Sequence, residues 1–339
     1  MMQPVATPMQ LFELVQSHRI TAVIYSAAKL GLAEALSDNA RTAEELALAV
    51  GADADALQRL LVALATLGIC TVEDDGKFAL TDIGRLLDQQ ACGSVKDWVI
   101  FEGEFLAKSW TGLLDSVRTG KTAAQLQGVA NSFDLMGRTP ESVAIFNAAM
   151  TNLTRLIVPD IVRSCDFSQS RVAMDVGCGS AALLAGILAR YDDLLGVGFD
   201  LPRCREAAEG QMQDQGFGSR FRFEPGDFFK AIPCGADTLL LKSVIHDWDD
   251  TRSAVILGNC KKALPPDGRL ILIERVMPER AAEDPHYRSH AFSSLNMLRG
   301  PGGRERSATE YAALLQASGF KLQTITPAGL FSVLQAEAR

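Results

Sequence analysis

Apolar residues recur along this chain with two different periods, and the change of period divides it into two parts. In the first part they follow helical steps of three and four over residues 10–36, from residue 42, and over residues 57–67. From residue 172 onward, short apolar runs alternate with helical segments. This alternation is typical of a doubly wound parallel sheet. The pattern therefore predicts a helical N-terminal part followed by an α/β part.

The N-terminal part reads as three helices followed by a hairpin. Thr42 and Glu45 make a capping box at the start of the second helix. The dipeptide Asp75-Gly76, between two short apolar runs, is a hairpin signal within residues 70–80. Three helices and a hairpin together predict a winged helix.

A winged helix commonly suggests DNA binding, but the charges here argue against it. The two helices after Arg41 carry four acidic residues against Arg59, namely Glu44, Glu45, Asp53 and Asp55. Carboxylates repel a phosphate backbone. We therefore expect a packing or dimerisation module, whose apolar helices also favour a homodimer.

Residues 93–163 read as mostly helical. One apolar stripe consists of Trp110, Leu113, Leu114 and Val117, and a second of Val143, Phe146, Met150, Leu153 and Ile157. The second follows steps of 3, 4, 3 and 4, which predicts one amphipathic helix with this face in the core. Because that helix leads directly into the α/β part, Phe146 and Met150 are also candidates to face a ligand.

Composition narrows the class of protein. The 339 residues are 47% hydrophobic and carry a formal net charge of -8, which argues against nucleic acid as the main partner. The seven cysteines include no C-x-x-C pair, so we expect reduced thiols in a cytoplasmic protein. We expect neither a signal peptide nor a membrane span.

The stretch Val172–Ser180, VAMDVGCGS, has the order of a buried strand, a glycine turn and a following helix. The third glycine of the dinucleotide fingerprint is missing, since Ala182 stands there, and Asp175 would repel a phosphate. Asp200 ends the next apolar run, at the spacing where such folds hold a ribose diol; a helix cap is the alternative. A cationic, ribose-bearing ligand such as S-adenosylmethionine (SAM) therefore fits better than NAD.

Six motifs then follow in order: DVGCGS at residues 175–180, GFDLP at 198–202, GDFF at 226–229, LKSVIHDWDD at 241–250, ALPPDGRLILIE at 263–274 and GGRERS at 302–307. With them the chain resembles the SAM-dependent small-molecule O-methyltransferases, which include caffeate-type, hydroxyindole and antibiotic-tailoring enzymes. The resemblance implies a Rossmann-like doubly wound SAM-binding domain with an N-terminal all-helical winged-helix dimerisation domain. The expected bounds are 1–95 for dimerisation, 96–163 for a helical linker and substrate-pocket region, and 164–339 for methyl transfer.

The resemblance also implies roles for residues that match the motifs. Those expected to bind SAM are Asp175, Gly177 and Gly179 at the methionine part, Asp200 and Leu201 at the ribose, Asp227 and Phe228 at the adenine, and Lys242 at the carboxylate or ribose. The turn reads GCGSA where many relatives have GGGTG. We expect this departure to alter the fit without abolishing binding.

His246 is the implied general base. Glu305 and Glu274 would orient its ring and Asp247 would support the site; we expect no metal ligand. A phenol with a pKa of about 10 is a poor nucleophile at neutral pH, and a histidine with a pKa of about 6.5 is neutral enough to accept its proton. The other histidines, His18, His286 and His290, are expected to be structural or at the surface.

The expected reaction is methyl transfer from SAM to a hydroxyl of an aromatic or polyketide-like small molecule. Candidate acceptor contacts are Phe146, Met150, Phe292, Asn296 and Met297, while Trp248 also fits a packing role under the HDW turn. The alternatives are C- or N-methylation, a SAM-binding enzyme that does not methylate, a ligand-sensing winged-helix regulator, and a nicotinamide dehydrogenase.

Overall fold

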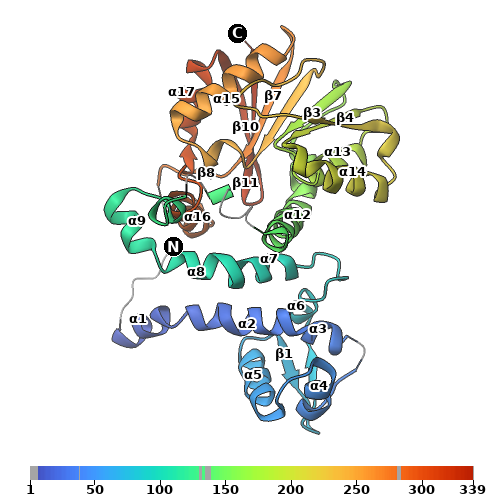
Figure 1. Ribbon diagram of the computed structural model, residues 1–339, viewed down its shortest axis with the longest axis vertical. Coiled ribbons are helices and arrows are strands. Elements are labelled where there is room, and N and C mark those ends of the chain that lie inside the picture. The colour runs from blue at the N-terminus through green and yellow to red at the C-terminus, as the bar shows by residue number, and fades with distance from the viewer. Residues whose placement is uncertain (1–6, 38, 130–131, 134–138, 281–283, 339) are drawn as a thin grey trace. The chain divides into compact units, whose positions relative to one another are not determined.

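The computed structural model describes residues 7–37, 39–129, 132–133, 139–280 and 284–338. The chain forms two compact units, one of Met2–Thr111 and Pro140–Leu153, the other of Gly112–Thr139 and Thr154–Arg339. Helix α12, Pro140–Ser164, contributes to both (Figure 1). Over the described ranges, no helix combines the length and apolar character needed to cross a membrane.

The smaller unit confirms the three helices and the hairpin. Its elements are α1 (Pro8–Val15), α2 (His18–Leu30), α3 (Leu32–Ala35), α4 (Ala43–Val50), α5 (Ala54–Thr66), β1 (Cys70–Val72), β2 (Phe78–Leu80), α6 (Asp82–Arg85), α7 (Lys96–Phe101), the π-helix η1 (Glu102–Leu106) and α8 (Ala107–Trp110). Both halves of the Thr42–Glu45 capping box form. Strand β1 pairs antiparallel with β2, with Val72 opposite Phe78.

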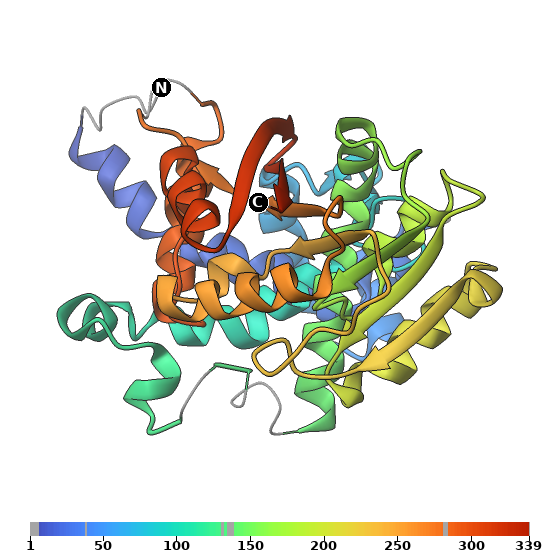
Figure 2. The ribbon, with the colours of Figure 1, turned by 90° about the horizontal axis from the view of Figure 1, so that it is seen from above.

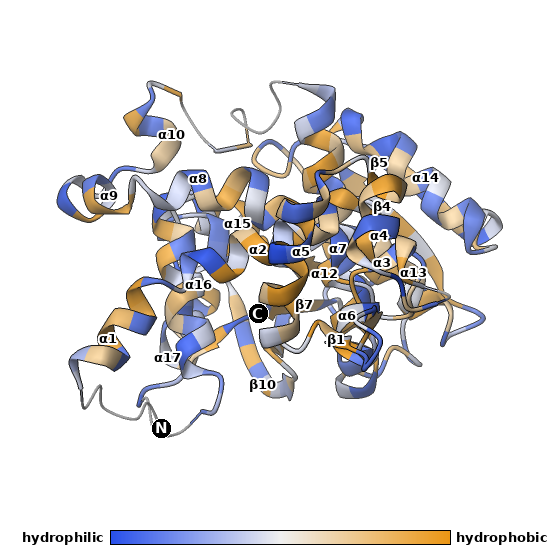
Figure 3. Ribbon diagram, turned by 90° about the horizontal axis from the view of Figure 1, so that it is seen from below, coloured by the Kyte–Doolittle hydropathy of each residue, from blue (hydrophilic) through white to orange (hydrophobic). Residues whose placement is uncertain are grey.

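Helix α1 has no buried residue, although most of its side chains are apolar (Figure 3). The exposed fraction is 60% for Phe12 and 67% for Val15. Clustered apolar exposure of this kind marks an interaction surface in a soluble protein.

The larger unit is built on a seven-stranded sheet in the order β10-β11-β7-β6-β3-β4-β5. The strands are β3 (Val172–Val176), β4 (Leu195–Asp200), β5 (Phe221–Pro225), β6 (Thr238–Lys242), β7 (Arg269–Glu274), β10 (Phe320–Ala328) and β11 (Phe331–Ala338). Strands β3 to β7 pair in parallel, and β11 joins β7 antiparallel, as β10 joins β11. Figure 2 follows them from red β10 and β11 to yellow β5. The expected parallel sheet and C-terminal hairpin at its edge are confirmed.

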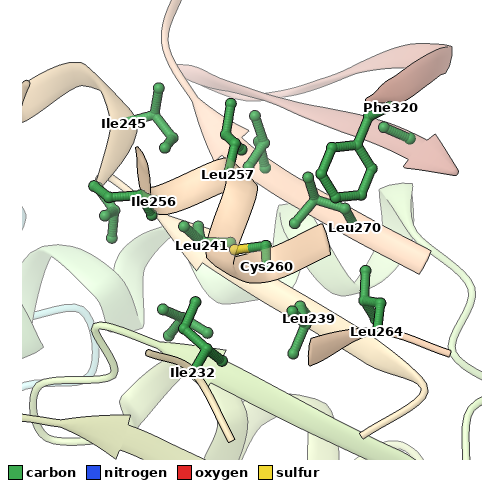
Figure 4. Close-up of a cluster of buried hydrophobic side chains, with 14 of the residues drawn as sticks. Ile232, Leu239, Leu241, Ile245, Ile256, Leu257, Cys260, Leu264, Leu270 and Phe320 are labelled. Atoms are coloured by element: carbon green, nitrogen blue, oxygen red, sulfur yellow. The ribbon is translucent and has the colours of Figure 1, made fainter. Parts of the chain in front are cut away.

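Alternate side chains of the strands fill two separate cores. Leu239 and Leu241 of β6 face α15 (Asp250–Ala263) and α17 (Ala308–Ala317), together with Ile256 and Phe320 (Figure 4). Leu240, between them, faces the opposite core, built with α12, α13 (Ala182–Leu188) and α14 (Arg205–Asp214). Because successive strand residues point to opposite faces, helices cover both faces of the sheet.

Short helices complete the larger unit. They are α9 (Leu113–Thr119), α10 (Ala123–Leu126), η2 (Pro202–Cys204), η3 (Gly218–Arg220), η4 (Ile245–Asp247) and α16 (Tyr287–Arg299), with a small parallel pair of β8 (Val276–Met277) and β9 (Arg306–Ser307).

Two expectations about the middle segment are wrong. The stripe from Trp110 to Val117 is broken, because α8 and α9 are separate helices and Val117 is 61% exposed. On α12, Ile157 is the one buried member of the predicted face, while Ala149 and Asn152 beside that face are buried. Because α12 packs in two units, its buried positions do not follow a single stripe.

Candidate active site

The carboxyl ends of the parallel strands bring the predicted site residues to one edge of the sheet. Asp175 lies near the end of β3, Asp200 ends β4, and Glu274 ends β7. His246 follows β6 on the short turn η4. In doubly wound sheets this edge is where ligands bind.

The glycine turn after β3 has the backbone that its sequence predicted. Gly177 and Gly179 have φ of 81° and 54°, a region that glycine enters without strain. Gly177 donates its N–H to the carbonyl of Phe199 at 2.8 Å, which anchors the turn on β4. A β-carbon at Gly177 would stand 3.0 Å from Val244, so the turn packs closely under the loop that carries His246.

Asp200 is held by the glycine turn itself. Its Oδ2 accepts the N–H of Gly179 at 2.9 Å and its Oδ1 the N–H of Leu201 at 2.6 Å. A carboxylate has about four acceptor positions, so two hydrogen bonds leave capacity for a vicinal diol. Asp200 therefore holds the glycine turn and still retains acceptors for a ribose. It does not cap the following helix η2, whose N-cap residue Leu201 makes no side-chain capping bond, so the alternative of a helix cap is wrong.

Asp175 is buried beneath this turn, and Lys242 close to it is partly buried. Burial raises the pKa of Asp175 to about 7; the charge of Lys242 opposes the increase and that of Asp200 adds to it. The Nζ atom of Lys242 donates to Oγ1 of Thr154 on α12 at 2.9 Å, and burial lowers the pKa of Lys242. The contacts of both residues with SAM stay predictions.

An aromatic cluster lies beside the turn. The ring of Phe228 is 4.9 Å from that of Phe229, and Trp248 packs edge-on against Phe229 at 4.8 Å. The carboxylate of Asp227 accepts the N–H of Phe229 at 2.9 Å. Trp248 therefore packs under the HDW turn, the structural role considered from its sequence.

Three carboxylates surround the ring of His246. Its Nδ1 atom lies 3.1 Å from Oε1 of Glu305 and 3.5 Å from Oε2 of Glu274, and its Nε2 atom lies 3.5 Å from Oδ1 of Asp247. The chain thus brings His246 together with Glu274 and Glu305, which lie 28 and 59 positions further along the sequence and which the resemblance implied as its partners. Among the described residues, the ligand atoms of His246, Glu274 and Glu305 also lie within 4.8 Å of one another, close enough to hold a metal ion.

The prediction that His246 is neutral near pH 7 is wrong. Burial disfavours the imidazolium, but the charges of Glu274, Glu305 and Asp247 outweigh burial and raise the pKa of His246 to about 10. Burial in turn raises the pKa of Glu274 to about 7 and that of Asp247 to about 6. His246 therefore carries a proton at neutral pH, facing at least one ionised carboxylate.

The turn that carries His246 is held by Glu274, which the resemblance implied for another role, and by Arg306, which it did not single out. Oε1 of Glu274 accepts the N–H groups of Val244 and Ile245 at 3.1 and 2.8 Å. The fully buried guanidinium of Arg306 donates to the carbonyls of Ile245 and Trp248 at 3.0 and 2.7 Å. Arg306 lies within the GGRERS motif, but nothing in its spacing pointed to this role.

Helix α16 adds one further contact and one correction. Ser293 donates to Oε1 of Glu305 at 2.6 Å, a bond that no motif indicated. His290, expected at the surface, is buried on α16, where its Nε2 atom lies 3.3 Å from Oδ2 of Asp284, a residue that precedes the helix. His18 and His286 are exposed, as expected.

The candidate acceptor contacts are divided between the two units. On α16, Phe292 is 54% exposed, Met297 is buried, and Asn296 accepts a hydrogen bond from Arg299. Phe146 and Met150 belong to the smaller unit, where the Phe146 ring lies edge-on to Phe101 at 5.7 Å. Their contacts with an acceptor stay predictions.

Comparison with known proteins identifies the family. A family model for the O-methyltransferase domain matches residues 110–321, and one for the O-methyltransferase dimerisation domain matches residues 12–90. The chain belongs to the O-methyltransferase family. This O-methyltransferase is 34% identical to the phenazine O-methyltransferase PhzM of Lysobacter antibioticus over 96% of this chain and 95% of that protein.

Solved structures support the same assignment. LaPhzM, known from a crystal structure, is 34% identical in sequence to this chain. The two structures match with a TM-score of 0.92 over 98% of this chain and 100% of LaPhzM. The O-methyltransferase NcsB1 from neocarzinostatin biosynthesis, solved with SAM and 2-hydroxy-5-methyl naphthoic acid, is 29% identical with a TM-score of 0.79, over 94% and 96% of the two chains. A 29% identical relative from Pseudomonas aeruginosa, matched over 94% of both chains, is a phenazine-1-carboxylate N-methyltransferase.

SAM is the cofactor of this O-methyltransferase, and the residues at the sheet edge fit it. The glycine turn lets backbone approach a ligand closely, Asp200 retains acceptors for a diol, and buried Asp175 offers a carboxylate near a cationic group. The matched dimerisation domain agrees with the expected module at the N-terminus.

Proposed function

We propose that this enzyme methylates a hydroxyl group of an aromatic or polyketide-like small molecule, and that His246 takes the hydroxyl proton. The observation that carries the proposal is the contact between Nδ1 of His246 and Glu305 at 3.1 Å. A carboxylate on Nδ1 keeps a proton on that nitrogen and leaves Nε2 to exchange a proton with the acceptor.

The raised pKa of His246 suits a phenol. A phenol with a pKa of about 10 and an imidazolium whose pKa is also about 10 bind the proton almost equally well. The reactive pair, a phenolate beside the imidazolium, is therefore close in energy to the neutral pair. Both nitrogens of the resting imidazolium carry a proton, so His246 has to release its Nε2 proton before it takes one from a phenol. An acceptor that arrives as a phenolate meets the imidazolium directly, without a transfer step.

SAM, when bound, supplies a methyl group on a sulfonium, which the acceptor oxygen displaces in line. The chain's residues have to bind and align the two reactants, which supplies much of the rate of such a reaction. In this proposal Asp200 and Leu201 hold the ribose, Asp175, Gly177 and Gly179 hold the amino-acid end, Asp227 and Phe228 flank the adenine, and Lys242 contacts the carboxylate or ribose.

The acceptor class follows from the relatives and from the candidate side chains. Two relatives are named for aromatic acceptors, as a phenazine O-methyltransferase and a 2,7-dihydroxy-5-methyl-1-naphthoate 7-O-methyltransferase. On this chain Phe292, Asn296 and Met297 of α16 would supply apolar walls and one amide, and Phe146 and Met150 of the other unit stay candidate acceptor contacts. Such a pocket fits a flat acceptor with a few polar groups.

We further propose that the enzyme works as a homodimer through its dimerisation domain. The exposed apolar side chains of α1, which include Met9, Leu11, Phe12 and Leu14, would then be covered by the second copy. The segment 96–163 would serve the acceptor pocket.

The test uses SAM carrying a labelled methyl group and a panel of phenols, naphthols and hydroxyphenazines. The expected product is heavier by one methylene and is cleaved as a methyl ether, which separates O- from C- and N-methylation. His246→Ala should lower kcat by about 10² to 10⁴ while leaving SAM binding intact, and His18→Ala, at an exposed histidine, serves as the control. Full activity of His246→Ala on an accepted phenol would contradict the base assignment.

A further inference from the structure

The hydroxyl of Ser293 makes an unusual hydrogen bond for a serine inside a helix. Ser293 lies in the middle of α16, and its Oγ donates to Oε1 of Glu305 at 2.6 Å. Serines within helices commonly bond to a carbonyl of the preceding turn instead. Hydroxyl-to-carboxylate bonds of about 2.5–2.7 Å are charge-assisted and stronger than neutral ones. This bond therefore ties α16 to the carboxylate of Glu305.

The same carboxylate oxygen also faces the histidine. Oε1 of Glu305 lies 3.1 Å from Nδ1 of His246, and Oε2 lies 3.3 Å from it. Ser293, Glu305 and His246 thus form a continuous chain of hydrogen bonds. The last torsion of a glutamate is broad, so a carboxylate held on one side only is free to rotate. The hydroxyl of Ser293 removes that freedom.

Glu274 does not duplicate this role. Its Oε1 is occupied by the backbone N–H groups of Val244 and Ile245, and its Oε2 lies 3.5 Å from Nδ1, longer than a normal N–H···O bond. Burial raises the pKa of Glu274 to about 7. For Glu305 burial acts in the same direction, but His246, Ser293 and Arg275 outweigh it and lower the pKa. Glu305 is therefore the carboxylate that stays ionised.

We propose that Ser293 is a positioning residue for methyl transfer, whose hydroxyl fixes Glu305 so that the ring of His246 presents Nε2 to the acceptor. This inference rests on the proposed role of His246 as the base. Helix α16 also carries Phe292, Asn296 and Met297, the candidates for acceptor contact. One helix would then align the base and contact the acceptor.

The first test does not depend on turnover. The imidazole of His246 is titrated by ¹⁵N NMR in the wild type and in Ser293→Ala, Ser293→Thr and Ser294→Ala. Ser294 is the matched control, since within the described residues its hydroxyl makes no hydrogen bond to Glu305. We expect the midpoint to fall by about one pH unit in Ser293→Ala, because a loosened Glu305 stabilises the imidazolium less. Thr at position 293 and Ala at position 294 should keep the wild-type midpoint.

The second test measures kinetics with an accepted phenol. Ser293→Ala should lower kcat by about tenfold, a part of the effect of a general base, with the KM for SAM unchanged. Because the pKa of His246, the proposed base, should fall in Ser293→Ala, the acid limb of the kcat profile should move to lower pH in that variant. Ser293→Thr should restore both kcat and the acid limb.

The outcomes separate the two proposals. An unchanged His246 midpoint in Ser293→Ala overturns the role of Ser293 whether or not the enzyme methylates phenols. A threonine variant that behaves like the alanine variant also overturns it, since the hydroxyl is retained. A wild type that methylates none of the phenols overturns the proposed function, while the NMR result still decides on Ser293.

Discussion

Gly303 lies against the carbonyl oxygen of His246 so closely that a β-carbon at position 303 would stand 2.0 Å from it. The neighbouring Arg304 donates its N–H to the same oxygen at 2.9 Å. Backbone of the GGRERS segment therefore supports the turn that carries the base. No side chain fits at position 303 unless that turn moves.

Gly303→Ala should therefore lower activity more than stability. A displacement of the base of about 1 Å is enough to cost on the order of 10² in rate. Gly210→Ala, on the exposed face of α14 with nothing within 4 Å of the added β-carbon, is the control and should be neutral or stabilising. The comparison measures kcat and Tm for both variants. Equal kcat values would show that the turn tolerates the displacement.

Arg306 and Arg304 offer a matched pair for stability, since both contact Asp250 but only Arg306 is buried. Arg306→Met leaves the carbonyls of Ile245 and Trp248 without their donor and should cost about 2–4 kcal/mol. Arg304→Met removes two partly exposed ion pairs, with Asp250 and Glu310, and should cost no more than about 1 kcal/mol. Urea unfolding with a shared m-value gives both numbers. Similar losses in the two variants would contradict the clamping role of Arg306.

Two glycines in the left-handed backbone region allow the effect of strain on stability to be separated from an effect on SAM binding. Gly177 and Gly216 have φ of 81° and 77°, but only Gly177 lies in the turn at the sheet edge. Alanine at either position should lower the free energy of unfolding by about 1 kcal/mol through backbone strain. The loss should be larger at Gly177, where the β-carbon would stand 3.0 Å from Val244, than at Gly216, where nothing lies within 4 Å. Calorimetry should show weaker SAM binding for Gly177→Ala alone. Weakened binding in both variants would attribute the effect to general destabilisation.

His246 should make the enzyme less stable as the pH becomes alkaline. Its pKa is about 10 when folded, above the ordinary value of 6.5, so its contribution is fully present below about pH 6.5 and is lost as pH rises through 10. The difference in unfolding free energy between the wild type and His246→Gln should therefore shrink by roughly 1–4 kcal/mol between pH 7 and 10. Denaturant unfolding at several pH values tests this. A constant difference would mean that His246 is not held as an imidazolium.

Local sequence patterns predicted most of the fold. The strand at Val172–Val176, the Thr42–Glu45 cap and the hairpin around Asp75-Gly76 each depend on a few neighbouring residues, and all three form. The stripe on α12 did not predict burial correctly, because a helix shared by two units is not packed on one face. Its sequence reports the apolar face but not what covers it.

The site was predictable only in part. The glycine turn and Asp200 follow from spacing, whereas Glu274 and Glu305 were implied by the family resemblance, since their distance from His246 depends on the order of strands in the sheet. No sequence pattern indicated a role in the site for Ser293, Gly303 or Arg306. The predicted protonation state of His246 was wrong for the same reason. An isolated imidazole has a pKa near neutrality, and three carboxylates from separate segments raise that pKa.

The edge of the sheet takes one group from each of β3, β4, β6 and β7, and another from the segment before α17. The groups are spread over residues 175–305, so a growing chain should stay inert until residue 305 has been added and docked. Turnover should consequently report assembly of the four parallel strands that carry the site, and local unfolding of any one of them should abolish it.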